Sequence, residues 1–154
     1  MPTAKDVAQY ILSKQDVAAE DTISNLKLQK LVYYAQGFTL AMTNEPLFNE
    51  KIEAWDHGPV VPALYHEYKG YKGGSIPPPA EEDIQKVQGI FSDQQKEIID
   101  EVLDVYGQFS AWKLRNLSHE DEPWINHHEK VDTTIYPDEM KNYFKQLLVN
   151  NGKD

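Results

Sequence analysis

Residues 24–44, SNLKLQKLVYYAQGFTLAMTN, decide the fold of this chain. Ser24 is a good helix N-cap, and the apolar residues that follow it recur at helical spacing. One face carries Leu28, Leu31, Val32, Ala35, Thr39 and Met42, and a second face carries Leu26, Tyr33, Tyr34 and Phe38. Because a helix that is apolar on two sides must be covered on both, we expect it in the centre of the domain. Gly37 costs about 1 kcal/mol relative to Ala inside a helix, which indicates that another backbone passes close to it.

Helical patterns account for most of the remaining chain. Further helices are expected over residues 3–14, 60–71, 92–110 and 137–150, and over 110–124 as a helix with its exit. The residues that favour their starts are Thr3, Pro59 with Pro62, Ser92 with Gln95, Ser110, and Pro137. The pattern therefore predicts a bundle of about six helices.

A short β element is expected next to this bundle. Residues 52–57 alternate in polarity and read as a strand that Gly58-Pro59 ends. The loop over residues 70–83 contains Ser75-Ile76, which could pair with that strand, so a strand pair or hairpin is expected near 52–57 and 74–77. The predicted fold class is mainly α with minor β. We expect a single domain over residues 1–154, because neither half would bury enough apolar surface alone.

Composition excludes several classes of function. The chain has 154 residues, no Cys and a net charge of −10, so thiol catalysis, disulfides and thiolate metal sites are ruled out. No apolar run is long enough to span a bilayer, and the N-terminal segment is a poor signal peptide; we expect a cytoplasmic protein with no membrane partner. A surface of this charge disfavours nucleic-acid binding and favours a basic partner, although acidic proteins are also common for reasons of solubility.

No catalytic or metal motif is complete. His66-Glu67 and His119-Glu120 each lack the second His one helical turn later, since Gly70 and Pro123 stand there. Residues that could supply nitrogen and oxygen ligands cluster at His119, Glu120, Asp121, Glu122, His127, His128 and Glu129, but their spacing matches no known site. Asp56 cannot easily orient His57, because adjacent strand residues point to opposite faces. We therefore expect no catalytic residue, metal or cofactor.

Two surface regions are candidates for binding a partner. Residues 81–104 contain eight acids against two lysines. From them we select Glu97, Asp100, Glu101 and Asp104, although a solvated helix face is the simpler explanation of these acids. The second candidate is the glycine- and proline-rich loop, with Tyr71 and Lys72 at its start. A Tyr-Lys platform for single-stranded nucleic acid is the weaker interpretation of that segment.

Three motifs together resemble one known family. They are a Leu-x-Lys-Leu-x-Tyr-Tyr-Ala-Gln-Gly helix from Leu28 to Gly37, an Ala-Trp-x-x-Gly-Pro-Val corner from Ala54 to Val60, and a Ser-His-x-x-x-Pro-Trp turn from Ser118 to Trp124. This combination resembles the SocA-like antitoxin family, also called the Panacea domain and formerly the phage-associated GepA-like proteins. The resemblance runs from about Asn25 to the C-terminus.

The resemblance implies a bacterial or phage antitoxin that neutralises a cognate toxin by direct contact. Such a toxin is typically encoded beside its antitoxin, and the family has no agreed catalytic residues. Whether the antitoxin blocks the toxin or presents it to a AAA+ protease stays open, as does a homodimer. Two alternatives remain: a small metal-dependent hydrolase that uses His57, His119 and nearby acids, and a phage-encoded regulator that docks on a host protein.

The motif residues are expected to have structural roles, with a functional pocket between the two corners as the alternative. They are Tyr34, Gly37, Trp55, Asp56, His57, Gly58, Pro59, Ser118, His119, Pro123 and Trp124. We expect Trp55 in the core, Gly58 at the corner and Pro59 at the start of the next helix. Asp56 or His57 would cap that helix or meet a buried polar group, and His119 would hydrogen-bond to backbone.

Overall fold

A computed structural model describes residues 1–16 and 22–152 of the chain. Its elements are α1 (Ala4–Ser13), α2 (Asn25–Thr43), β1 (Ile52–Trp55), β2 (Gly58–Val60), α3 (Pro62–Tyr68), the 3₁₀ helix η2 (Lys69–Tyr71), α4 (Glu81–Gln88), α5 (Asp93–Tyr106), α6 (Ala111–Ser118), α7 (Glu122–His127), β3 (Thr134–Ile135) and α8 (Pro137–Gly152). The predicted fold class, mainly α with minor β, is confirmed.

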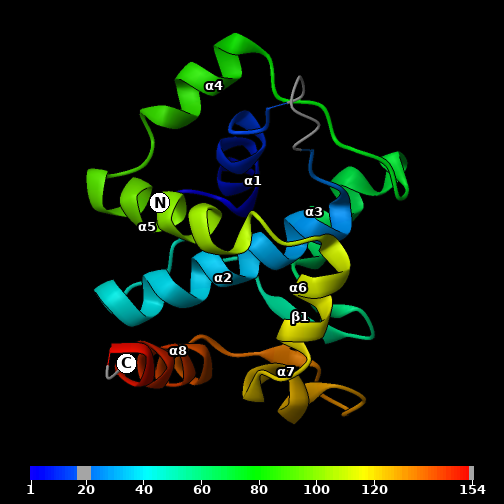
Figure 1. Ribbon diagram of the computed structural model, residues 1–154, viewed down its shortest axis with the longest axis vertical. Coiled ribbons are helices and arrows are strands. Elements are labelled where there is room, and N and C mark those ends of the chain that lie inside the picture. Colours follow the sequence, from blue (N-terminus) through cyan, green and yellow to red (C-terminus); the bar gives the residue numbers. More distant parts are fainter. Residues whose placement is uncertain (17–21, 153–154) are drawn as a thin grey trace.

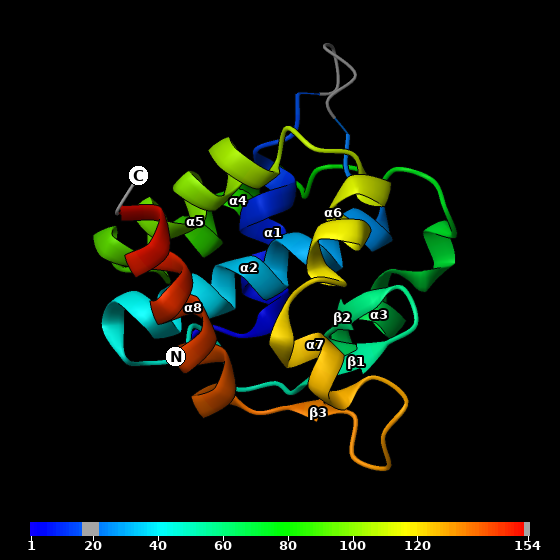
Figure 2. The same cartoon turned by 60° about the horizontal axis from the view of Figure 1, so that its bottom comes forward.

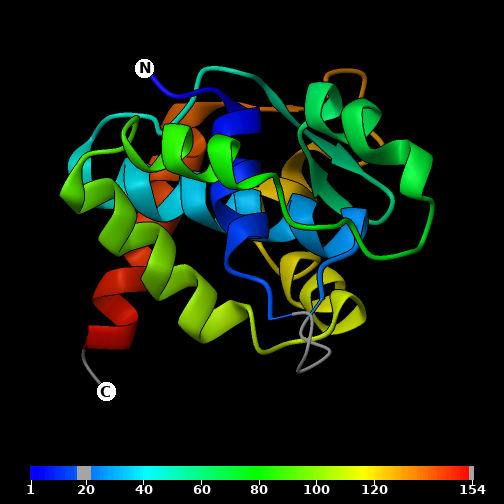
Figure 3. The ribbon, with the colours of Figure 1, turned by 90° about the horizontal axis from the view of Figure 1, so that it is seen from above.

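Helix α2 lies at the centre, as its two apolar faces predict. It crosses the middle of the molecule with α5 on one side and α8 on the other, and α1 and α6 also pack on it (Figure 1). The view from above shows the same arrangement, with α2 enclosed by later helices (Figure 3). Its first three turns are buried almost without interruption.

Side-chain caps set four helix starts where the sequence places them. The capping side chains are Thr3, Ser24, Ser92 and Ser110, and each accepts a hydrogen bond from the backbone N–H three residues ahead. At α1 and α5 the bond is reciprocal, because the side chain of Asp6 or Gln95 accepts from the capping residue's own N–H. Local chemistry therefore determines these boundaries.

The sheet differs from the predicted strand pair. Strand β1 lies between β2 and β3, and both pairings are antiparallel. The segment at 74–77 does not join this sheet: Ser75 forms an isolated bridge with Ser24, and Ile76 N–H donates to the carbonyl of Ile23 at 2.9 Å. The expected partner was wrong because the two-residue connection Asp56–His57 returns the chain at once into a hairpin, in which Trp55 pairs with Gly58.

One predicted helix start and the number of helices also change. Pro59 lies inside β2, so the next helix starts at Pro62 rather than at Pro59. Within the described residues there are eight α-helices rather than about six, since α4 and α7 form where a loop and a helix exit are expected. Both are short, and α7 begins with Glu122-Pro123, a typical helix opening. Such short helices carry too few turns to show a period in the sequence.

Two expectations about packing are corrected. The close neighbour of Gly37 is an aromatic ring, not a backbone: a Cβ there would lie 2.2 Å from Cε2 of Phe144 in α8. Trp55 is half-buried, packs edge-on against Tyr65 at a centroid distance of 5.1 Å, and donates from Nε1 to Glu53. The tryptophan in the core is Trp124 of α7. Among the described residues, no helix combines the length and apolar character that crossing a bilayer requires.

Candidate functional site

The two motif corners meet over the end of the sheet. Figure 2 shows α7 beside the β1–β2 hairpin, below α6. Trp124 Nε1 donates a hydrogen bond of 2.7 Å to the carbonyl of Trp55. The rings of His119 and His128 stack on Trp124, at centroid distances of 3.9 and 4.2 Å. The hairpin and the turn that carries Ser118 to Trp124 are therefore fixed to each other by one indole.

A buried lysine lies beneath this junction. Lys30 has no exposed surface, and its Nζ donates to the carbonyl of Pro59 at 2.9 Å. Gly58 has a φ of +113°, and a Cβ there would lie 2.5 Å from Cε of Lys30 and 2.8 Å from Oγ of Ser118. Burial, together with the smaller effect of the nearby charge of Arg115, lowers the pKa of Lys30 to about 7. Gly58, which has no side chain, thus leaves space for the buried amine of Lys30.

A buried carboxylate, Asp121, contacts α2 at Tyr33, three residues after Lys30. Asp121 accepts hydrogen bonds from the hydroxyls of Tyr33, at 2.9 Å, and Tyr143, at 2.7 Å. Burial raises the pKa of Asp121 to about 6, although both tyrosine hydrogen bonds act in the opposite direction. Tyr33 belongs to α2 and Tyr143 to α8, so Asp121 joins the start of α7 to two other helices. No ion pair links Lys30 to a carboxylate in the described part of the chain.

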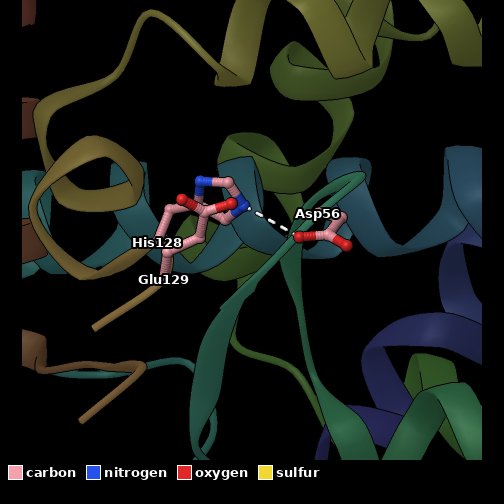
Figure 4. A group of neighbouring side chains, drawn as sticks. All are labelled: Asp56, His128 and Glu129. Carbon is pink, nitrogen blue, oxygen red and sulfur yellow. Dashed lines mark hydrogen bonds and ion pairs between the residues drawn. The ribbon is translucent and has the colours of Figure 1, made fainter. Parts of the chain in front are cut away.

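Three side chains at the tip of the hairpin have metal-ligand chemistry. Asp56 Oδ1 lies 2.9 Å from His128 Nε2, and ligand atoms of Asp56, His128 and Glu129 lie within 4.8 Å of one another (Figure 4). The hydrogen bond to His128 lowers the pKa of Asp56. A carboxylate–imidazole–carboxylate group suits a borderline cation such as zinc, but the Asp56 side chain is 86% exposed. The same contact also fixes the end of α7 against the hairpin.

The histidines of the hydrolase alternative have other partners. His57 Nδ1 accepts from Nε of Arg115 at 3.4 Å, and Arg115 lies over the ring of Trp112. Nε2 of His119 is buried without a hydrogen-bond partner among the described residues, but His119 does form the predicted hydrogen bond to backbone, with Asp56 as its partner. Burial, followed by the charge of Arg115, lowers the pKa of His119. Among the residues that the structure describes, neither imidazole is paired with a carboxylate as a general base would be.

The predicted partner-binding residues do not form one surface. Glu97, Glu101 and Asp104 are exposed on α5. Asp100 is half-buried and accepts a 2.8 Å hydrogen bond from the hydroxyl of Tyr10, so it also holds α1 against α5. Tyr71 ends η2, which follows α3, and Lys72 comes directly after it. Helices α3 and α5 lie on different sides of α2 in the view of Figure 1.

Sequence reasoning missed the buried polar residues of α2. Asn25, Gln29 and Gln36 recur at helical spacing, and this stripe was the available signal. Gln29 Oε1 accepts from the backbone N–H of Val61 at 3.0 Å, and Gln36 Oε1 accepts from that of Leu47 at 2.7 Å. These amides satisfy the backbone of segments that have no helix or strand partner there. Lys30 was missed in the same way, because a lysine looks like a surface residue. Tyr33 was assigned to an apolar face and Asp121 to a group of possible metal ligands, but the hydrogen bond between them was not predicted.

Known proteins resemble this chain over the central helix and the two corners. A family model described as "Antitoxin SocA-like, Panacea domain" matches residues 28–125. "Antitoxin SocA" of Caulobacter vibrioides (strain NA1000 / CB15N) is 34% identical over 139 residues, which cover 79% of this chain and 68% of that protein. No solved structure matches the chain. The span of the family model includes most of α2 and both motif corners.

Proposed function

The chain belongs to the SocA-like antitoxin family with the Panacea domain, and from this premise we propose that it neutralises a cognate toxin by binding it directly. The family match carries the proposal. It covers most of the central helix and both corners, so the match concerns a large part of the fold and not a short motif.

The chemistry of the site supports binding rather than turnover. Lys30 and Asp121 are buried and engaged in holding helices and the hairpin, so they are out of reach of a substrate. The exposed charge is mostly acidic, and the net charge of −10 favours a toxin with a basic surface. Toxins that act on nucleic acid or on translation need such surfaces.

Co-expression tests the proposal directly. The neighbouring gene is expressed alone and together with this chain, and we expect growth arrest in the first case and recovery in the second. Purified toxin and this chain should then elute as one complex, and its mass gives the stoichiometry, including any homodimer. Recovery without any complex would contradict neutralisation by direct contact. A shorter toxin half-life that depends on a AAA+ protease would favour delivery over blocking.

A metal-dependent hydrolase is the second candidate, and the Asp56–His128–Glu129 group is the observation that favours it. Metal analysis of the purified protein separates the two functions. Stoichiometric zinc or manganese that Asp56→Asn and His128→Ala both remove would favour the enzyme. If both variants still neutralise the toxin, the group is not needed for the antitoxin function.

A further inference from the structure

We propose that the toxin inserts an amphipathic helix with a basic flank into the groove between α5 and α8. The proposal rests on the proposed function and names the surface and the partner chemistry that carry it. The groove is lined by Phe38, Met42, Ile98, Glu101, Val102, Val105, Tyr106 and Leu148, and its volume is about 220 Å³.

The groove exists because two helices pack on α2 without closing over it. Helices α5 and α8 both pack on α2, and they lie on either side of it (Figure 1). Phe38 in the second half of α2 provides the floor, Val102 and Tyr106 of α5 one wall, and Leu148 of α8 the other.

Apolar side chains at the rim lack the cover that a core provides. Met42 is 46% exposed and Val105 is 51% exposed. The helical pattern of α5 predicts that Val105 points inward with Val102 and Tyr106, but only part of that stripe has a helix to pack against. Adjacent exposed apolar residues beside a concave surface are typical of an interaction site.

Aromatic contacts order both the floor of the groove and the α5 wall. The rings of Tyr34 and Tyr106 stack at a centroid distance of 4.1 Å, and Phe38 lies 4.9 Å from Phe144 in an edge-to-face contact. A floor that is already ordered costs little conformational entropy when a partner binds.

Charge and size identify the occupant. On α5 the exposed acids Glu97, Glu101 and Asp104 recur at helical spacing beside the apolar wall, and Glu101 itself lines the groove. A partner with lysines or arginines next to its apolar residues complements this rim. A volume of about 220 Å³ is below the roughly 300–1,000 Å³ of pockets that bind small molecules, but it suits a few anchoring side chains of a helix.

Other exposed apolar side chains fit less well. Trp112 is 61% exposed, but the Arg115 guanidinium lies over its ring at 4.5 Å, so that surface already carries a positive charge. Ile125 on α7 is 49% exposed but does not line this groove. It therefore serves as a matched control.

The test measures the affinity of the purified neighbouring-gene toxin for variants of the chain. Val105→Glu and Met42→Glu should each weaken binding by about tenfold or more, whereas Ile125→Glu should change it less than about threefold. Melting temperatures are compared first; because the replaced side chains are about half-exposed, all three variants should remain folded. Equal losses of affinity in Val105→Glu and Ile125→Glu, or no loss of affinity in either groove variant, would contradict the proposed binding groove.

A second pair of variants tests the basic flank. Glu101→Lys and Glu82→Lys change the net charge equally, and both residues are exposed, but only Glu101 lines the groove. We expect Glu101→Lys to weaken binding by several-fold more than Glu82→Lys. Equal effects would mean that only overall charge matters, and the proposed flank would be wrong.

Hydrogen exchange of the complex identifies the segments in contact. We expect protection in α5 and in the second half of α2, and protection in the toxin over an amphipathic helix with lysines or arginines. Protection of an acidic or extended toxin segment would overturn the proposed occupant. If wild-type chain and toxin do not bind at all, the antitoxin proposal itself fails; if they bind with protection elsewhere, only the groove fails.

Discussion

At the scale of single residues, Gly58 has to satisfy two constraints at once. Its φ of +113° strains any side chain, and a Cβ would collide with Lys30 and Ser118. We therefore expect Gly58→Ala to lower the free energy of unfolding by about 2–4 kcal/mol, measured by urea denaturation.

Gly70→Ala is the matched control for this prediction. Apart from Gly70 and its two chain neighbours, no residue in the described ranges has an atom within 4 Å of the position where its Cβ would be. We expect it to change the free energy of unfolding by less than about 0.5 kcal/mol. Similar values for the two alanine variants would show that the junction relaxes and that Gly58 is not required there.

Lys30 makes stability depend on pH. Its pKa is about 7 in the folded protein against 10.5 ordinarily, so between these values the unfolded chain binds a proton that the folded chain does not. The free energy of unfolding therefore rises with pH across this window and is lowest below it. Lys30→Met removes the titration, so the wild type should gain about 2 kcal/mol relative to the variant between pH 7 and about pH 9.

The chosen window isolates the lysine. Asp121, whose folded pKa is about 6, is already largely ionised at its lower end, and ordinary tyrosines still hold their protons at its upper end. The measurement is urea denaturation of both proteins at half-unit steps of pH. Parallel stability curves for wild type and Lys30→Met would show that the amine titrates in its ordinary range despite its burial.

At the scale of elements, α2 shows what sequence patterns can and cannot predict. Its position and Ser24 cap follow from periodicity and capping, which are local. Lys30 and Gln29 were not assigned to the interior because their partners, the backbones of Pro59 and Val61, come from a distant segment. The motifs also locate the two corners in the sequence. They do not predict the contact between Asp56 and His128, because that contact depends on where α7 ends.

The α2–α8 packing depends on Gly37. The ring of Phe144 occupies the space that a side chain at position 37 would need. Gly37→Ala improves helix propensity by about 1 kcal/mol, but overpacking costs about 1–3 kcal/mol, and because the ring is fully buried it has little room to move. We expect a net loss of about 1–2 kcal/mol in the free energy of unfolding.

A double-mutant cycle with Phe144→Leu tests this explanation. In the Leu background the same alanine should cost less, or even stabilise the protein, because the smaller side chain relieves the collision. An identical cost of Gly37→Ala in both backgrounds would place its effect elsewhere than at the α2–α8 contact.

At the scale of the whole molecule, acidic charge is concentrated on one side of the fold. Residues 81–104, which form α4 and most of α5, contain eight of the acids against two lysines. A field of this kind accelerates the approach of a basic partner, whereas the contacts made afterwards determine how long the complex lasts. The acidic charge should therefore affect mainly the association rate constant, and the contacts in the groove should affect mainly the dissociation rate constant.

If the toxin is basic, its association rate should fall steeply with salt. Raising the ionic strength from about 0.01 M to about 1 M shortens the Debye length from roughly 30 Å to roughly 3 Å, and we expect the association rate constant to fall by a factor of about 10–1,000. Reversing Glu97, Glu101 and Asp104 to Lys should flatten this dependence. Asp100 is left unchanged, because replacing it would break its contact with Tyr10.

Stopped-flow mixing gives the association rate constant. Val105→Glu is the comparison: it should mainly raise the dissociation rate constant and keep the wild-type salt dependence. A rate of association that does not change with salt would rule out electrostatic steering by this face.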